Sequence, residues 1–169
     1  MRMVLFRHGI AAELMEMRAP SARDVDRPLT AEGARKVRKA GRALRSLGIR
    51  PDLLLHSGLV RARETAELLA VHLRPREPRL LVADALEPDA DPIRVLERVA
   101  RLKVRSLVAV GHAPNLDRVI ALACGIVGPP LTELGKAGAA CLDLPDPGRS
   151  PGRLVWLLPP KLLRRLAAG

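Results

Sequence analysis

Strand-like and helix-like patterns alternate along the chain, and this alternation restricts it to a layered α/β fold. Six short apolar runs have the length and composition of buried strands. Longer segments between most of these runs carry apolar residues at helical spacing. The strand-like runs are Met3–Arg7, Asp52–His56, Leu80–Ala83, Ser106–Val110, Ala139–Leu144 and Leu154–Leu158.

The predicted helices begin and end at recognisable residues. The longest follows Thr30, a hydroxyl N-cap, and ends at Gly48, a residue suited to a helix C-terminus. A second follows Ser57, which is predicted to be its N-cap. The others begin at Asp91-Pro92, after Pro114 and over Pro160–Leu166. Because no repeat or linker interrupts the 169 residues, we expect residues 1–169 to form a single domain.

Composition indicates a folded cytoplasmic protein. The hydrophobic fraction of 48% is enough for a core, and no apolar stretch is long enough to cross a bilayer or to serve as a signal peptide. The two cysteines, Cys124 and Cys141, lie in apolar surroundings and indicate neither a disulfide framework nor a metal cluster. We therefore expect a monomer in the reducing cytoplasm, with no membrane partner.

The net charge of +11 has two explanations. One is the arginine-rich composition of chains from GC-rich genomes, and the other is an acidic partner such as nucleic acid or an acidic protein face. The basic residues are spread along the sequence, and the two aromatic residues, Phe6 and Trp156, lie inside apolar runs. These observations favour the compositional explanation and disfavour nucleic acid as a partner.

Polar residues follow three of the predicted strands. Arg7-His8-Gly9 ends the first run, Ser57 and Arg61 follow the second, and Gly111-His112 follows the fourth. In open α/β sheets, ligands bind where the carboxyl ends of strands meet helix N-termini. We therefore expect these three segments to converge at one edge of the sheet and to form a cationic pocket with two histidines.

This set of residues suits phosphoryl chemistry without a metal ion. A neutral His8 can attack phosphorus and form a phosphohistidine. The Arg7 and Arg61 guanidinium groups can bind phosphate oxygens, and His112, cationic next to the phosphate, would complete the clamp. Gly9 is predicted to relieve crowding beside the bound phosphate. The remaining histidines show no metal-ligand spacing, so we expect no metal and no cofactor.

Two further residues have alternative interpretations. Glu87, after the third strand, is a candidate proton donor to a leaving group or an ordinary loop acid, and Asp84 is a poorer candidate for the same role. Arg27 could close over the phosphate or pair with Asp24 or Asp26, and the structural role is slightly favoured. Arg63 lies off the Arg61 face of its helix and is expected at the surface.

The combined motifs resemble those of the histidine phosphatase superfamily, which includes the cofactor-dependent phosphoglycerate mutases. The similarity rests on the order of the Arg7-His8-Gly9 tripeptide, the Ser-x-x-x-Arg-Ala-x-x-Thr run from Ser57, and Gly111-His112. The short length, the Arg-Pro-Leu-Thr segment from Arg27 and the Trp-x-x-Pro-x-Lys-Leu segment from Trp156 are similar to SixA-type phosphohistidine phosphatases.

This resemblance implies a phosphoglycerate mutase-like, three-layer sandwich with a mixed, mostly parallel sheet flanked by helices. It also implies a phosphoenzyme on His8, phosphate contacts from Arg7, Arg61 and His112, and a phosphorylated histidine-phosphotransfer domain as substrate. Two features depart from that pattern. Ile10 stands where an acidic residue is expected in many relatives, and Glu87 could be a general acid that the branch can lack.

The sequence is compatible with three functions. The leading prediction is a phosphohistidine phosphatase, and the first alternative is a small-molecule phosphomonoesterase that uses Glu87. A basic nucleic-acid or acidic-protein binding module is a remote third, because the set of His8, Arg7, Arg61 and His112 is intact. A mutase is disfavoured because the chain lacks room for large insertions over the site.

Overall fold

A mixed six-stranded sheet forms the centre of the protein, seen in a computed structural model that describes residues 1–17, 23–75 and 80–168. Its strand order is β3-β2-β4-β1-β5-β6, in which β1–β4, β4–β2 and β2–β3 are parallel and β5 and β6 are antiparallel additions. The strands are β1 (Arg2–Arg7), β2 (Leu53–His56), β3 (Leu80–Val82), β4 (Ser106–Gly111), β5 (Ala139–Asp143) and β6 (Arg153–Leu158). All six predicted strands are confirmed.

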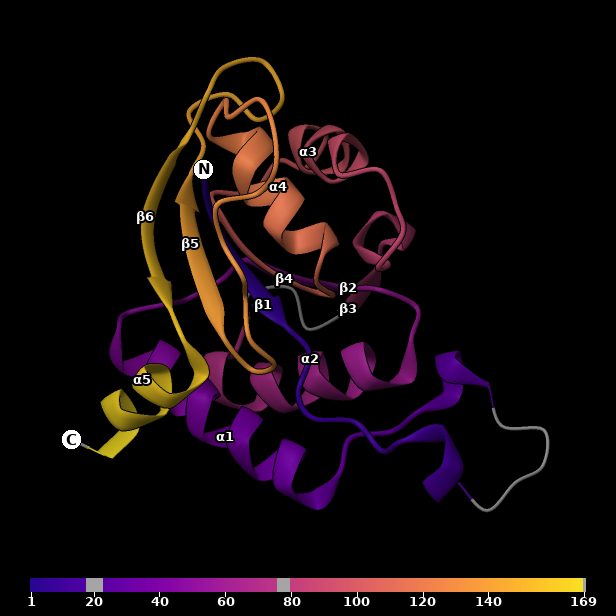
Figure 1. The fold of residues 1–169 in the computed structure, drawn as a ribbon. Coiled ribbons are helices and arrows are strands. Elements are labelled where there is room, and N and C mark those ends of the chain that lie inside the picture. Colours follow the sequence, from indigo (N-terminus) through magenta and orange to yellow (C-terminus); the bar gives the residue numbers. More distant parts are fainter. Residues whose placement is uncertain (18–22, 76–79, 169) are drawn as a thin grey trace.

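Helices cover both faces of this sheet and complete the predicted three layers (Figure 1). One face is covered by α1 (Ala31–Ser46), α2 (Val60–Leu73) and α5 (Pro160–Arg165), and the other by α3 (Ile93–Ala100) and α4 (Asn115–Ala123). Short 3₁₀ turns follow several strands or lie in the connections. These are η1 (Leu14–Glu16), η2 (Asp24–Asp26), η3 (Asp84–Leu86) and η4 (Leu166–Ala168).

Successive side chains of a strand point to opposite faces of the sheet, so the core is divided into two halves. In β1, Met3 and Leu5 pack toward α3 and α4, whereas Val4 and Phe6 pack toward α1 and α2. All four side chains are fully buried. A strand with both faces buried reads as a continuous apolar run, which explains why β1 lacks an alternating polar pattern.

The predicted helix ends are confirmed in part. The Thr30 hydroxyl accepts a hydrogen bond from the Gly33 N–H, and Gly48 adopts a positive φ of 78° just after α1. Asp91 accepts from the Ile93 N–H at the start of α3. The prediction for Ser57 is wrong, because α2 begins later, with Leu59 as its N-cap residue and no side-chain cap.

Strand pairing brings the predicted site segments to one sheet edge. The parallel register of β1 and β4 places Arg7 opposite Gly111, so that His8 and His112 follow at the same level. In β2, His56 is opposite Val110, and Ser57 comes next. Within the described ranges, no helix has the length and apolarity needed to cross a membrane.

Candidate active site

Two buried histidines form the centre of this edge. His8 follows β1 and His112 follows β4, and their side chains lie in contact with ring centroids 4.7 Å apart. His8 is 6% exposed and His112 is 2% exposed. The structure thus brings together two residues that are about a hundred positions apart in the sequence, as their strand-end positions predicted.

His8 is held as a neutral imidazole in a defined tautomer. Its Nδ1 donates to the carbonyl oxygen of Gly9 at 2.6 Å, so the second ring nitrogen, Nε2, carries the free lone pair. Burial, together with the nearby charges of Arg61, Arg7 and Lys136, lowers the pKa of His8 to about 4 against the opposing effect of the hydrogen bond to Gly9. At neutral pH the ring is therefore uncharged, and the unprotonated Nε2 is able to act as a nucleophile.

His112 is fixed by Ser57. A hydrogen bond of 2.7 Å joins the Ser57 hydroxyl to His112 Nε2, and Ser57 is fully buried. Burial, together with the proximity of His8 and Arg61, lowers the pKa of His112 to about 3. In the free site both rings are therefore neutral at pH 7, and a cationic His112 beside a bound phosphate remains a prediction. Ser57 acts as a partner of this histidine instead of a helix cap.

Arg61 reaches the site from the first turn of α2. Its guanidinium is almost fully buried and lowers the pKa of both histidines. One turn later on the same face, the Thr65 hydroxyl donates to the Arg61 carbonyl at 2.7 Å and accepts from the Gly9 N–H at 3.1 Å. The α2 N-terminus is therefore tied directly to the His8 segment.

Gly9 is required for packing. A Cβ atom there would lie 2.7 Å from Val37 Cγ2 and 3.0 Å from Leu29 Cδ2. Because its N–H is already donated to Thr65, Gly9 offers no free amide to a phosphate in this structure. In the free site Gly9 lets the His8 segment pack against Val37 of α1, and its place beside the bound phosphate remains a prediction.

Arg7 is held by a loop that follows α4. Its Nη1 donates to the Leu134 carbonyl at 2.8 Å, and its buried Nε has no hydrogen-bond partner among the described residues. The Asp117 carboxylate accepts from the Leu134 N–H at 2.9 Å and from the Thr132 hydroxyl at 2.8 Å. Burial lowers the pKa of Arg7, and the charges of Asp117 and Glu133 oppose that effect.

Glu87 lies at the rim of the cluster. Its Oε1 would be 3.9 Å from a Cβ at Gly58, the residue after Ser57. The Asn115 amide holds the surrounding turn by donating to the carbonyls of Ala85 at 2.8 Å and Glu87 at 2.6 Å. Among the described residues, the Glu87 carboxylate forms no hydrogen bond, and no contact joins it to His8.

The structure assigns the remaining candidates to structural positions. Arg27 pairs with Asp24 at 2.9 Å, which confirms the structural interpretation of Arg27. Arg63 is exposed and faces Glu67, as expected for a surface residue. Asp84 is exposed and lines a surface depression with residues of α3.

Sequence reasoning missed three contributors to the site. Lys136 lowers the pKa of His8 from a loop that has no recognisable motif. Asn115 and Asp117 lie in the first turn of α4 and anchor neighbouring loops. Their proximity to Gly111-His112 in the sequence was the available signal, since a buried polar residue in the turn after a strand end commonly holds a neighbouring loop. Across residues 1–17, 23–75 and 80–168, no three His, Cys, Asp or Glu side chains form a group suited to a metal ion.

A neutral buried histidine beside two arginines, at the carboxyl edge of a mixed sheet, can bind a phosphoryl group and attack it. Such an arrangement is suited to phosphoryl transfer. The chain belongs to the histidine phosphatase superfamily, whose branch 1 family model matches residues 3–85. An uncharacterised protein of Picosynechococcus sp. is 39% identical over 142 residues, which is 82% of either chain.

Solved structures support the same assignment. The protein histidine phosphatase SixA, complexed with tungstate, superimposes with a TM-score of 0.83 and 25% identity, over 95% of this chain and 98% of that one. The alpha-ribazole phosphatase from Shigella flexneri shares the fold, with a TM-score of 0.71 and 19% identity over 95% of this chain and 97% of that one. The chain is therefore a SixA-like member of a superfamily of phosphatases.

Proposed function

We propose that this protein hydrolyses phosphohistidine on a phosphorylated protein, through a phosphohistidine intermediate on His8. The observation that carries the proposal is the state of His8. Its Nδ1 is committed to the Gly9 carbonyl, its pKa is about 4, and two arginines lie close enough to lower that pKa. This leaves Nε2 unprotonated at neutral pH and surrounded by positive charge.

In the first step, His8 Nε2 attacks the phosphorus atom in line with the leaving nitrogen of the substrate imidazole. The new N–P bond forms as the old one breaks, and the departing imidazole takes a proton from solvent. In the second step, water attacks the phosphohistidine, its proton passes to solvent, and inorganic phosphate leaves. Free His8 is restored, so the net reaction consumes one water molecule per phosphate released.

Arg7 and Arg61 are proposed to bind the oxygens of the transferred phosphoryl group. The buried Arg7 Nε lacks a partner among the described residues, and a phosphate oxygen would satisfy it. A charge-assisted hydrogen bond of this kind is about twice as strong as a neutral one. His112 is proposed to gain a proton when the phosphate anion approaches, because a neighbouring negative charge raises the pKa of an imidazole.

The surface around the site favours a protein substrate. Met15 is 92% exposed, and Leu14 and Val25 are also exposed on η1 and η2, beside the segment that contacts Arg61. Apolar side chains at the rim suit a protein surface better than a small, strongly hydrated phosphoester. The similarity to SixA, which is named a protein histidine phosphatase, supports the same choice.

A small phosphomonoester is the second candidate, and the position of Glu87 favours it. An alcohol is a poorer leaving group than imidazole and benefits from a proton donor. Glu87 is half-buried, its backbone is held by Asn115, and its carboxyl group stands near Gly58. The α-ribazole phosphatase fold match is compatible with this alternative and establishes the fold alone.

The proposal is tested by measuring phosphate release from a phosphohistidine-bearing protein and from an aryl phosphate. We expect release by the wild type, complete loss in His8→Ala, and little change in His72→Gln, a matched histidine outside the site. Labelled phosphate should remain covalently attached to the wild type after rapid quenching at alkaline pH, where phosphohistidine is stable, and should be missing from His8→Ala. Retained turnover in His8→Ala would exclude the covalent route.

The Glu87→Gln variant distinguishes between the two candidate substrate classes. If Glu87 is a general acid, this change should slow hydrolysis of the aryl phosphate about 100-fold or more. Phosphohistidine hydrolysis should change by less than about threefold, since imidazole needs little help to leave. Equal loss on both substrates would assign Glu87 to the structure of the η3 turn.

A further inference from the structure

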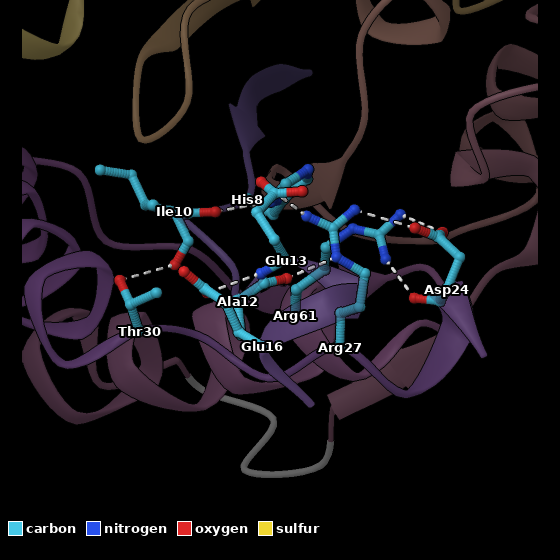
Figure 2. A network of polar contacts seen from close by, with 10 residues as sticks. His8, Ile10, Ala12, Glu13, Glu16, Asp24, Arg27, Thr30 and Arg61 are labelled. Carbon is cyan, nitrogen blue, oxygen red and sulfur yellow. Dashed lines mark hydrogen bonds and ion pairs between the residues drawn. The ribbon is translucent and has the colours of Figure 1, made fainter. Parts of the chain in front are cut away.

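Arg61 already has an anionic partner within the protein. Its Nη1 donates to the backbone carbonyl of Asp24 at 2.7 Å, and its Nη2 donates to Asp24 Oδ2 at 2.9 Å (Figure 2). The Arg61 side chain is 6% exposed, whereas that of Asp24 is 50% exposed. The two residues are 37 positions apart, so this contact joins η2 to the first turn of α2.

Asp24 is itself held on its other oxygen. Arg27 Nη1 donates to Asp24 Oδ1 at 2.9 Å, and Arg27 Nε donates to the Ala12 carbonyl at 2.6 Å. Arg27 Nη2 also lies 3.2 Å from Glu13 Oε1. Figure 2 shows the resulting row of Glu13, Arg27, Asp24 and Arg61. Burial raises the pKa of Asp24, but the hydrogen bonds from Arg27 and Arg61 outweigh it and give a net lowering, so the carboxylate stays charged at neutral pH.

The geometry leaves Arg61 able to bind a second anion. A guanidinium carries five N–H donors, and two of those of Arg61 are used by Asp24. An arginine side chain loses about 2 kcal/mol of rotamer entropy when it is fixed, so a head group that is fixed beforehand binds phosphate more strongly. A carboxylate that occupied all the donors would instead compete with the substrate.

We propose that Asp24, braced by Arg27, is a positioning residue that holds the Arg61 guanidinium beside His8 before the phosphoryl group arrives. The inference rests on the proposed role of Arg61 in binding phosphate. It assigns a function to the acidic side chain of η2 that contacts Arg61. Asp24 remains in place during the reaction, and the substrate uses the donors of Arg61 that Asp24 leaves free.

The test compares Asp24→Asn with Asp26→Asn, a matched change in the same turn. The Asp26 carboxylate pairs with Arg23 and has no described contact with Arg61. For Asp24→Asn we expect kcat/KM to fall about ten- to 100-fold, the range for losing a hydrogen bond between charged groups. Asp26→Asn should stay within about twofold of the wild type, and urea unfolding should show that both variants are folded.

A double-mutant cycle identifies the route of the effect. If Asp24 acts through Arg61, Asp24→Asn should cause no further loss in an Arg61→Ala background. Additive losses would overturn the proposal. A gain in kcat/KM or in phosphate affinity for Asp24→Asn would also overturn it, because that outcome identifies Asp24 as a competitor for Arg61.

Titration with tungstate or inorganic phosphate keeps this test independent of turnover. Asp24→Asn should bind tungstate about tenfold more weakly than the wild type, with Asp26→Asn unchanged, even if neither phosphorylated substrate is hydrolysed. Absent turnover with weakened tungstate binding would reject the proposed reaction and retain the role of Asp24. Normal turnover with unchanged affinity and kinetics in Asp24→Asn would reject the role of Asp24 and retain the reaction.

Discussion

Ser57 and His112 show how a single buried hydrogen bond organises the site. The serine hydroxyl is 2.7 Å from an imidazole nitrogen that is shielded from water, so no solvent molecule can replace it easily. A buried polar atom that loses its partner costs about 1–3 kcal/mol. The orientation of the His112 ring therefore depends on a residue that performs no chemistry itself.

Ser57→Ala should lower kcat/KM about tenfold, since a loss of about 1.4 kcal/mol in the transition state corresponds to that factor. Steady-state kinetics with the phosphohistidine-bearing protein would measure the change. Ser46→Ala is the matched control, because the Ser46 hydroxyl donates to the Arg42 carbonyl at the exposed surface of α1, away from the site. Unchanged kinetics in Ser57→Ala would show that His112 keeps its orientation without this hydrogen bond.

Local sequence predicted the residues that lie at strand ends but not their partners. His8 and His112 could be placed because each directly follows an apolar run, and strand pairing then brings them together. Ser57 was misassigned because the N-cap rule uses only nearby residues, whereas its actual partner is 55 positions away. Lys136 has no local signal at all, since only the folded loop brings its charge toward His8.

At the level of elements, the N-terminus of α1 packs directly against the backbone of the segment that follows His8. The Thr30 N–H donates to the Ile10 carbonyl at 2.9 Å, and a Cβ at Gly33 would fall on that same carbonyl. Only glycine allows α1 to begin against the His8 segment in this way. Sequence periodicity predicted α1 and its cap, but it gave no indication that Gly33 faces the Ile10 backbone.

Gly33→Ala should lower the free energy of unfolding by about 1–3 kcal/mol and should also reduce activity, because α1 must move away from the His8 segment. Gly48→Ala is the comparison: its added Cβ meets nothing, and its cost of about 1–2 kcal/mol comes from the positive φ alone. Urea unfolding and phosphate release measure the two effects. Normal activity in Gly33→Ala would mean that the Ile10 segment moves without disturbing His8.

At the scale of the whole molecule, the two buried histidines of the site lower the free energy of unfolding in acid. The pKa values of His8 and His112, about 4 and about 3, lie below the ordinary value near 6.5. The unfolded chain therefore binds protons more readily than the folded one as pH falls below about 6.5. The stability that the two histidines contribute is complete above that pH and is lost progressively toward pH 4 for His8 and pH 3 for His112.

The free energy of unfolding should fall by about 1 kcal/mol per pH unit for each histidine between pH 6 and pH 4.5. Urea midpoints measured across this interval test the expectation. His8→Asn should show a shallower dependence than the wild type, since one of the two buried imidazoles is removed. A pH-independent midpoint would indicate that both rings gain protons in the folded state as easily as in water.

The position of β1 in the sheet has a consequence for synthesis. Of the six strands in the sheet, β1 is synthesised first, whereas its two neighbours, β4 and β5, begin only at Ser106 and Ala139. At ordinary elongation rates, its apolar segment waits on the order of ten seconds for a partner. During that interval Met3, Val4, Leu5 and Phe6, all fully buried in the finished sheet, have no native strand to cover them. The strand that presents His8 is therefore exposed to aggregation until β4 and β5 have been made.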